Sequence, residues 1–265
     1  MLKALQAQSL VNHLKVIFID DGSTDETAAF LSNQSDLVVL KGDGNLWWAG
    51  AIQEGLEYVR TQHPTIDDYV LFLNNDVWFG SDYVETLTHV SQTYGGAAVG
   101  SVLHVVAKAS ALASIGPRVN NVRFRTTDVL SELSDEERAN PKDVYPVDAL
   151  SGRGVLYPAL LFDRFGRMRP RLLPHYFADY ELAIRFRCNG VCLLTSSKAI
   201  VYSDPIFGND VTTLGWVDRY FSQRSSANLY RKLIFYLLIS SPMQRVTFPG
   251  RLCFFMFKKI VNKCK

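Results

Sequence analysis

Two short apolar segments that each run directly into polar side chains constrain the fold of this chain most strongly. The first is Val16-Ile-Phe-Ile, followed by Asp20 and Asp21, and the second is Tyr69-Val-Leu-Phe-Leu, followed by Asn74, Asn75 and Asp76. Uninterrupted apolar runs of this length are typical of strands buried on both faces of a parallel sheet. Ligands of such sheets bind beyond the carboxyl ends of the strands. Asn-Asn-Asp alone is equally typical of a turn, but its repetition after two strands favours a ligand site.

Helices are predicted after both segments, which indicates a β-α-β alternation. Gly22 permits a sharp turn, and Ser23 with Glu26 forms a capping-box pattern that opens a helix over Asp25–Leu31. A second strand is predicted over Leu37–Lys41, before a helix that runs through Arg60. Carboxylates gathered at one end of such a sheet would bind a cation or accept hydrogen bonds from ligand hydroxyls.

Outside these segments, some stretches of residues 1–147 have a clear helix or strand pattern and others do not. A helix capped by Ser81 ends before two glycines at 95–96, and a strand follows over 97–106. Residues 107–147 show weak periodicity and are expected to form a partly mobile surface excursion. Met1–Leu14 is predicted to be a helix, so no strand precedes Val16, although a doubly buried strand normally has a neighbour on each side.

The segment from Gly42 to Gly50 combines glycines with two tryptophans and is a candidate binding loop. Gly44 and Asn45 lie where the backbone could approach a ligand closely, and the face of Trp48 could stack on a base or a sugar. Ordinary core packing is the alternative for these tryptophans. The glycine spacing does not match G-x-G-x-x-G, so a nicotinamide site is not supported.

A second loop and a helix supply further candidates. Ser151-Gly-Arg-Gly is a permissive loop in which Arg153 could meet an anion such as a diphosphate, although a plain turn is an equal alternative. Asp179 lies in the first turn of a predicted helix, where the helix dipole stabilises its charge. Glu181 and Arg185 are spaced to form an i, i+4 ion pair. On position alone, Asp179 is more typical of a helix-start residue than of a catalyst.

Charge is balanced over the whole chain but not along it. The chain has 28 basic and 26 acidic residues, while residues 217–265 contain ten basic residues and one acid. This tail carries +9, which leaves −7 for residues 1–216 because the total is +2. An acidic body excludes nucleic acid as an expected partner, and a basic, apolar tail suits an anionic membrane surface. The four cysteines show no metal spacing and no signal peptide is visible, so a cytoplasmic location is expected.

The tail, residues 216–265, is expected to be a helical appendage to a domain over residues 1–215. One helix is predicted over Trp216–Ser241, and its apolar core, Leu233–Ile239, is far shorter than the roughly 20 residues that span a bilayer. Leu252–Phe257, followed by two lysines, suits an interfacial helix. Packing of both segments on the body or on a second subunit is the alternative.

Five motifs together resemble glycosyltransferase family 2, most closely its rhamnosyltransferase-like bacterial members. They are Phe18-Ile-Asp-Asp-Gly-Ser-Thr-Asp, Gly44-Asn-Leu-Trp-Trp-Ala-Gly-Ala, Leu73-Asn-Asn-Asp-Val, Ser151-Gly-Arg-Gly and Ala178-Asp-Tyr-Glu-Leu-Ala-Ile-Arg. The resemblance covers roughly residues 2–204. It implies an α/β GT-A fold, with a mostly parallel central sheet flanked by helices, and an inverting transfer of rhamnose or another hexose. The implied partners are a nucleotide-sugar donor, a glycan or lipid-linked acceptor, and Mg²⁺ or Mn²⁺.

The resemblance also implies roles for individual residues. Asp20 and Asp21 match positions that hold the nucleoside, and Asp179 matches the catalytic base. Asn74-Asn75-Asp76 matches the D-x-D motif, in which Asp76 meets the metal and the diphosphate. The first carboxylate of that motif is an amide here, which predicts weaker metal binding. Asp204 is the candidate for a late metal ligand that is often histidine in the family.

A further departure concerns the start of the chain, because family members begin with a strand that this chain lacks before its first helix. A truncated, inactive and membrane-associated remnant is therefore the alternative to an active enzyme. Two other classes fit less well. A haloacid-dehalogenase-type phosphatase needs its two aspartates separated by one residue, and a sugar nucleotidyltransferase needs a basic Gly-rich loop near its start.

Overall fold

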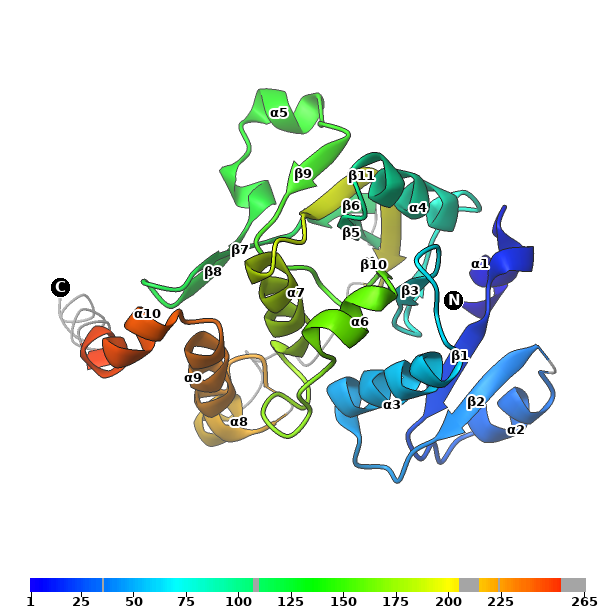
Figure 1. Cartoon of the computed structure of the whole chain (residues 1–265), viewed down its shortest axis with the longest axis horizontal. Helices are drawn as coiled ribbons and strands as arrows, with labels where there is room; N and C mark the ends of the chain where they lie inside the picture. The colour runs from blue at the N-terminus through cyan, green and yellow to red at the C-terminus, as the bar shows by residue number, and fades with distance from the viewer. Residues whose placement is uncertain (35, 107–109, 205–214, 224, 254–265) are drawn as a thin grey trace.

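The computed structural model describes the chain except for residues 35, 107–109, 205–214, 224 and 254–265 (Figure 1). Its main sheet has seven strands in the order β3-β10-β5-β11-β4, with β6 paired to β5 and β9 paired to β11. The strands are β3 (Tyr69–Phe72), β4 (Val77–Trp78), β5 (Ala98–Val106), β6 (Ser110–Ser114), β9 (Val144–Pro146), β10 (Val155–Pro158) and β11 (Leu193–Ser203). β5 and β11 are parallel, and β10 lies antiparallel between β3 and β5. The α/β architecture, with a central sheet flanked by helices, agrees with the predicted fold class. The expectation that this sheet is mostly parallel is wrong: among its described strand pairs only β5–β11 is parallel, because β4, β6, β9 and β10 all pair antiparallel to their neighbours.

The first two strands form a separate sheet. β1 (Val16–Asp20) pairs in parallel with β2 (Leu37–Lys41) over five residues, and neither strand joins the main sheet. Both strands lie where the sequence predicts them. The expected burial on both faces is not found, since only Asp20 of β1 and Phe72 of β3 are fully buried. Within the described residues, β1 and β3 each have a strand neighbour on one edge only.

Helices cover both faces of the main sheet. α3 (Trp47–Thr61), α6 (Leu160–Phe165) and α7 (Ala178–Cys188) contribute to one hydrophobic cluster, which is centred on Phe72, Tyr157 and Phe186. α1 (Leu2–Gln6) and α4 (Tyr83–Thr93) contribute to a second cluster around Leu87 and Val99. Because buried apolar area dominates folding free energy, these two clusters make the main sheet the stable part of the molecule.

Two predicted helices have other boundaries in the structure. The helix after β1 is α2 (Thr27–Ser32), and it has no Ser23–Glu26 capping box; the Asp25 carboxylate accepts the Thr27 amide instead. The helix predicted over Met1–Leu14 is broken into α1 and a 3-10 turn, η1 (Val11–His13). The break occurs at Gln8, whose buried amide bonds to backbone groups of Gly80 and Val84.

Residues 110–147 contain regular elements rather than a mobile excursion. Besides β6 and β9, they form the hairpin β7 (Pro117–Asn120) with β8 (Arg125–Asp128), the 3-10 turn η2 (Val129–Glu132), and α5 (Asp135–Ala139). Asp128 organises this segment, because its carboxylate accepts hydrogen bonds from Ser114, Ile115 and Leu130. Such long-range contacts are invisible to periodicity, which explains the wrong prediction.

The tail is helical, but the single helix predicted over Trp216–Ser241 is two helices, α8 (Trp216–Phe221) and α9 (Leu229–Leu238), followed by α10 (Pro242–Val246). Asn228 caps the start of α9, because its side-chain oxygen accepts the Arg231 amide. Its side-chain nitrogen donates to the carbonyls of Phe221 and Ser222 at the end of α8. α9 packs on α7 through the stacked rings of Phe235 and Phe177. The segment predicted over Leu252–Phe257 lies largely outside the described residues. Among the helices that the structure describes, none has the length and apolar character needed to cross a bilayer.

Candidate active site

Asp20 and Asp21 at the end of β1 are both engaged by backbone amides. Asp20 is buried and accepts the Ser23 amide, and hydrogen bonding from the Ser23 side chain, followed by that from its amide, lowers the pKa of the Asp20 carboxyl group. One oxygen of Asp21 accepts the Gly44 amide at 2.8 Å, and the other accepts Leu46 at 2.9 Å and Trp47 at 3.2 Å. Asp21 therefore anchors the Gly42–Leu46 loop at the start of α3, where the helix dipole favours a negative charge.

Close backbone contact explains the glycines of this loop. A Cβ at Gly42 would overlap the Asp21 carboxylate, and a Cβ at Gly22 would lie 3.1 Å from the Gly44 Cα. Gly44 has a φ of +85°, a conformation that L side chains rarely adopt. Gly44 and Asn45 are both exposed at the rim, so the loop keeps its backbone open to a ligand.

Trp48 joins the end of β3 to the loop after β9. Its indole Nε1 donates to the Asn74 side-chain oxygen at 3.1 Å. The same ring lies against Gly152 so closely that a Cβ at Gly152 would overlap it. The indole also meets Phe72 edge-on, with centroids 6.3 Å apart. Trp48 is thus a structural link between two predicted ligand-binding segments, and its half-buried ring is a wall of the space between them.

Asp179 is held at the beginning of α7 and is linked to the same loop. One carboxylate oxygen of Asp179 accepts a hydrogen bond from the Gly152 amide, and the other accepts one from the Tyr180 amide, both at 2.9 Å. Burial raises the pKa of Asp179 to about 6, although both hydrogen bonds and the charge of Arg153 act in the opposite direction. Phe177, two residues earlier, has a left-handed backbone with φ of 69°, which is a costly conformation for an aromatic residue. The backbone strain and the raised pKa are both typical of functional sites.

The Ser151–Gly154 loop is fixed from both sides. Tyr83 and Ser101 share a hydrogen bond at 2.6 Å, and Ser101 donates to the Gly154 carbonyl at 2.8 Å. Gly154 has a φ of +94°, and a Cβ there would overlap the Tyr83 hydroxyl. Arg153 is the half-buried cation of this loop and lies near enough to Asp179 to lower its pKa.

Asn75 and Asp76 occupy the exposed turn between β3 and β4. β4 pairs with the end of β11 so that Val77 faces Ser203. Asp76 directly precedes β4 and Asp204 directly follows β11, so both residues adjoin the same end of this strand pair. Both carboxylates are exposed, and carboxylate oxygens are the ligands that Mg²⁺ and Mn²⁺ prefer. Within the described part of the chain, no group of three or more His, Cys, Asp or Glu side chains could hold a metal alone.

His175 and Tyr157 lie beside the site without having been predicted. The Nδ1 atom of His175 is buried with no hydrogen-bond partner, and its ring lies 6.0 Å from that of Trp47. Burial lowers the pKa of His175, so the imidazole is neutral at pH 7. Tyr157 is a buried phenol whose pKa is raised, first by burial and then by the charge of Asp179. Nothing in the spacing of these residues marks them; the fold brings Tyr157 to Asp179 and His175 to Trp47.

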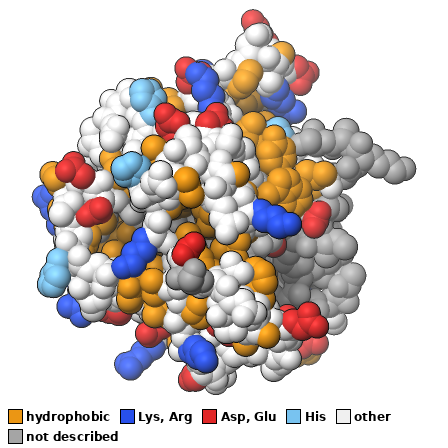
Figure 2. Space-filling model, turned by 90° about the vertical axis from the view of Figure 1, so that its right-hand side faces the viewer, with side chains coloured by type: hydrophobic (Ala, Val, Ile, Leu, Met, Phe, Trp, Pro, Cys, Tyr) orange, Lys and Arg blue, Asp and Glu red, His pale blue; other side chains and the backbone are white. Residues whose placement is uncertain are grey.

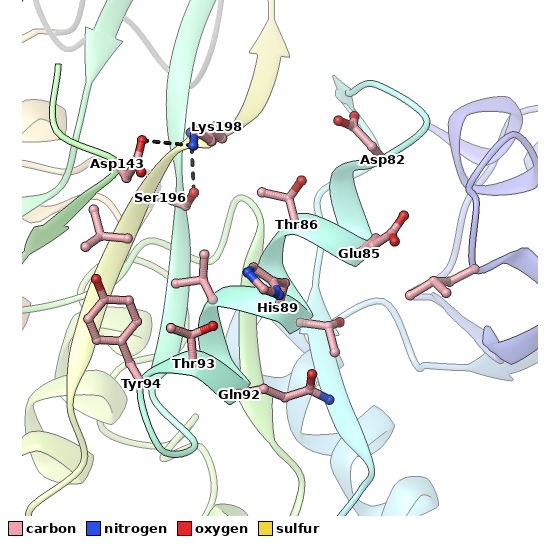
Figure 3. Close-up of a pocket in the computed structure, with 14 residues that line it drawn as sticks. Asp82, Glu85, Thr86, His89, Gln92, Thr93, Tyr94, Asp143, Ser196 and Lys198 are labelled. Atoms are coloured by element: carbon pink, nitrogen blue, oxygen red, sulfur yellow. Dashed lines mark hydrogen bonds and ion pairs between the residues drawn. The ribbon is translucent and has the colours of Figure 1, made fainter. Parts of the chain in front are cut away.

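A surface pocket of about 740 Å³ lies apart from these residues (Figure 3). It is lined mainly by α4 together with β9 and β11, including His89, Tyr94 and Lys198, and Lys198 pairs with Asp143 at 2.9 Å. None of the predicted site residues lines it. The candidate site is therefore the polar end of the strands rather than this pocket.

The structure brings the predicted residues into two linked groups. The first group is connected through contacts of Trp47, Trp48 and Gly152 and consists of Asp21, the Gly44–Trp48 loop, Asn74, the Ser151–Gly154 loop and Asp179. Asp76 and Asp204, which adjoin the same end of the β4–β11 pair, are the second group. This arrangement positions a carboxylate of raised pKa across from loops whose backbone is open to a ligand.

Comparison with known proteins identifies a matching family model and similar folds. Residues 1–125 match the model of glycosyl transferase family 2. The fold is similar to GalNAc-T7 with UDP, GalNAc and Mn²⁺ (TM-score 0.62, 12% identity, 95% of this chain and 51% of that one). It is also similar to S. aureus TarS 1–349 with UDP-GlcNAc (0.55, 15%, 97% and 66%). A third similar structure is the mannosyltransferase PcManGT from Pyrobaculum calidifontis with GDP-Man and Mn²⁺ (0.52, 16%, 76% and 51%). No curated protein matches the chain in sequence.

The chain has the fold of GT-A glycosyltransferases. The match to glycosyl transferase family 2 covers the first 125 of its 265 residues. The chain spans between about half and two thirds of the length of these similar structures.

Proposed function

We propose that the chain is an inverting glycosyltransferase that moves a sugar from a nucleotide-sugar donor to an acceptor hydroxyl. The observation that supports this most is the continuous set of contacts from Asn74 through Trp48 and Gly152 to Asp179. It couples the segment expected to meet the donor diphosphate to the carboxylate expected to act as base. UDP, UDP-GlcNAc and GDP-Man are bound by the similar structures, so a nucleoside diphosphate is the expected carrier.

Asp179 has the properties that a general base requires. With a pKa of about 6 it is mostly ionised at pH 7, yet it is a stronger base than an ordinary carboxylate. In the proposed reaction it takes the proton of the acceptor hydroxyl while that oxygen attacks the anomeric carbon. The bond to the nucleoside diphosphate breaks as the new glycosidic bond forms on the opposite face, which inverts the configuration. Arg153 would then face the departing diphosphate.

The donor set around Asp76 fits a divalent cation that is shared with the substrate. Mg²⁺ and Mn²⁺ commonly bind to one or two carboxylates plus substrate phosphates, and Asp76 with Asp204 offers two carboxylates. Asn74 and Asn75 supply neutral oxygens beside them. When bound, the metal would neutralise charge that develops on the leaving diphosphate. Because two carboxylates are few, we expect metal affinity to depend strongly on the presence of the nucleotide.

The tail is proposed to hold the enzyme on an anionic membrane on the cytoplasmic side, where a glycan or lipid-linked acceptor would be reached. Seven large apolar side chains of the tail are between 42 and 82% exposed: Val217, Phe221, Leu229, Tyr230, Leu237, Met243 and Val246. Basic residues accompany them, and each is worth roughly 1 kcal/mol near an anionic surface. Since α9 packs on α7, membrane contact would bring lipid-linked acceptors near Asp179. Rhamnose or another hexose in surface polysaccharide synthesis is the proposed sugar.

The direct test of the function is a donor screen with a matched pair of variants. Transfer from UDP-, GDP- and dTDP-sugars is followed by mass spectrometry with Mn²⁺ present. Asp179→Asn should reduce transfer about 10²–10⁴-fold while nucleotide affinity stays within about twofold. Asp163→Asn, on the exposed surface of α6, is the matched control and should transfer normally. Nucleotide binding without transfer by the unmodified chain would favour the inactive remnant instead.

Membrane attachment has a separate test. The protein should float with vesicles that contain anionic lipid at low salt and be released as salt rises, because screening weakens the attraction. Neutral vesicles are the control. Failure to bind anionic vesicles at low salt would contradict the membrane proposal and leave the catalytic one untouched.

A further inference from the structure

The surface pocket beside α4 has a floor of uncharged hydrogen-bonding side chains. Thr86, His89 and Thr93 are spaced by three or four residues, so they lie in one row along the helix. Gln92 lies beside this row, and all four side chains line the pocket (Figure 3). Among the residues drawn there, only those outside α4 are joined to one another by hydrogen bonds or ion pairs. The floor therefore offers donors and acceptors that no drawn neighbour uses.

The sequence of α4 is not the one that best stabilises a helix in water. Exposed helix positions are stabilised most by alanine, lysine, arginine, glutamate and glutamine, whereas threonine and histidine rank lower. α4 contains three threonines and one histidine but no alanine, lysine or arginine. Each threonine carries a hydroxyl beside a methyl group, so a row of them can meet both O–H and C–H groups of one ligand. This composition favours a ligand-binding face over a merely solvated one.

Two walls hold the pocket in shape. On one side, the chain before β1 is tied to α4, because the Ser9 hydroxyl donates to Glu85 and the Ser9 amide donates to the Ser81 carbonyl, both at 2.8 Å. On the other side, Lys198 of β11 pairs with Asp143 at 2.9 Å. α4 itself packs on strands β5 and β11 of the main sheet. The pocket is therefore formed before a ligand arrives, which lowers the cost of binding.

The charges around the pocket disfavour an anionic ligand. Three carboxylates line it against the single ammonium group of Lys198, which Asp143 already neutralises. On the side of the molecule that carries α1 and α4, acidic and basic side chains are interspersed with uncharged ones (Figure 2). A phosphate or a nucleotide would therefore meet more repulsion than attraction. The aliphatic lining consists of Leu10, Val90 and Val144, so an acyl chain would find little apolar surface.

One aromatic ring closes the end of the polar row. The Tyr94 side chain is 47% exposed, and within the described residues its ring stacks on no other aromatic ring. It directly follows Thr93 at the end of α4 and lies on the side of Asp143 (Figure 3). An exposed tyrosine presents an apolar face with a polar edge. Such a face suits a ring with C–H groups on its faces and hydroxyls around its edge.

We propose that this pocket binds a neutral oligosaccharide. One sugar ring stacks on Tyr94, and its hydroxyls form hydrogen bonds with His89, Gln92 and the threonines of α4. The volume of about 740 Å³ falls in the range of ~300–1,000 Å³ that is typical of small-ligand sites. The carboxylates of Asp82 and Glu85 suit the same ligand, because ionised acceptors form strong hydrogen bonds with hydroxyl donors.

The place of the pocket along β11 indicates which part of a glycan it holds, an inference that rests on the proposed function. β11 runs from Ser196 and Lys198 at the pocket to its end just before Asp204. The six residues from 198 to 204 span about 20 Å of extended chain. A sugar in the pocket is thus too far from Asp204 to be the sugar that is transferred. The pocket therefore holds a part of the acceptor or product glycan that is remote from the bond being formed.

The test is an NMR titration of the full chain with three neutral hexasaccharides, namely maltohexaose, laminarihexaose and chitohexaose. We expect at least one of them to shift the backbone amides of His89, Gln92 and Tyr94, with a dissociation constant in the millimolar range. Tyr94→Ala should weaken this binding at least about tenfold, whereas Tyr94→Phe keeps the ring and should bind within about threefold. Gln92→Ala should also bind more weakly. Its matched control is Gln6→Ala, at the exposed end of α1, which should bind normally.

Three outcomes would overturn the proposal. Unshifted amides with all three hexasaccharides would show that the pocket takes no neutral glycan, and equal binding by Tyr94→Ala would show that no sugar stacks there. Tighter binding of a heparin hexasaccharide or of trilysine would assign the pocket to a charged ligand. UDP, GDP and dTDP are titrated in parallel, and Tyr94→Ala should leave their binding unchanged. A chain that binds a hexasaccharide but none of these nucleotides would support the pocket and contradict the proposed transferase function.

Discussion

The main sheet and the β1–β2 pair both end in predicted site residues, but they hold those residues by different means. Strands β3, β10, β5, β11 and β4 are fixed by ladders on both edges, apart from the outermost, and by two buried clusters. β1 and β2 have one ladder between them and little burial. Asp179 and the Ser151–Gly154 loop belong to the first region, whereas Asp20 and Asp21 belong to the second.

The difference indicates how the two halves of the site are organised. In the main region, packing decides position: Gly152, Trp48 and Tyr83 leave no room for movement of the loop. In the β1–β2 region, the Asp21 carboxylate fixes the position of the loop at the start of α3, because it accepts hydrogen bonds from three backbone amides there. The proposed base is thus held by a core, and the proposed nucleoside site is held by hydrogen bonds.

Hydrogen exchange should reveal this difference directly, with the largest effect that we expect. Backbone amides of Ile17–Ile19 in β1 should exchange at least about 100-fold faster than those of Val99–Val102 in β5. The reason is that local opening of β1 exposes little buried surface, while opening of β5 disrupts both clusters. Exchange is read residue by residue by NMR, with β11 as a second protected reference. Equal protection of β1 and β5 would erase the distinction between the two regions.

Gly152→Ala should damage the main region. The new Cβ would overlap the Trp48 ring, and overpacking of this kind costs about 1–3 kcal/mol of unfolding free energy. Denaturant unfolding measures the loss. Gly250→Ala, where a Cβ meets nothing within 4 Å, is the control and should not destabilise the protein. An unchanged stability of Gly152→Ala would mean that the loop is looser than its contacts indicate.

Asp21→Asn should act on the other region alone. The amide replaces one of two charged oxygens that accept three amides, so the local opening free energy of the loop should fall by about 1–2 kcal/mol. Faster exchange at Gly44, Leu46 and Trp47 would report it. Global unfolding should shift by less than about 0.5 kcal/mol, since this region opens first. Asp67→Asn, an exposed aspartate, is the control, and a large global loss would contradict the separation of the two regions.

Sequence reasoning reached the elements whose pattern is local. β2 was predicted over Leu37–Lys41 with its observed bounds, because an apolar run flanked by polar residues needs no tertiary information. The Glu181–Arg185 pair, predicted from i, i+4 spacing, is present at 3.1 Å. These successes share one property, since each depends on residues within one turn or one strand.

The rest depends on partners that are distant in the chain. Gln8 ends α1 because its amide reaches Gly80 and Val84, and no nearby residue announces this. Asp21 was predicted to hold a nucleoside, a role that remains a prediction, but its three loop amides could not be foreseen from adjacent aspartates. His175 escaped notice for the same reason, because its neighbour Trp47 is more than a hundred residues away.

The pH dependence of transfer should follow the main region only. Because Asp179 must be ionised to accept a proton and its pKa is about 6, kcat/KM should be about tenfold lower at pH 5 than on the plateau above pH 7. Hydrogen bonding lowers the pKa of Asp20, so the charge of this residue should not change over that range. Nucleotide affinity measured from pH 5 to pH 8 should therefore vary much less than kcat/KM. Parallel loss of both would mean that the titrating group acts on donor binding.

The unfolding free energy should also depend on the ionisation of Asp179, but it should fall with rising pH whereas kcat/KM rises. The folded-state pKa of Asp179 lies above the ordinary value of 3.8, so the folded protein binds the extra proton between about pH 4 and pH 6. The contribution of this carboxyl group to stability is therefore fully present below about pH 4 and is lost as the pH rises through 6. Asp179→Asn should flatten this part of the stability curve and leave the protein no less stable at pH 7. A variant that unfolds more easily at pH 7 would show that the two backbone hydrogen bonds of Asp179 outweigh the cost of burying its charge.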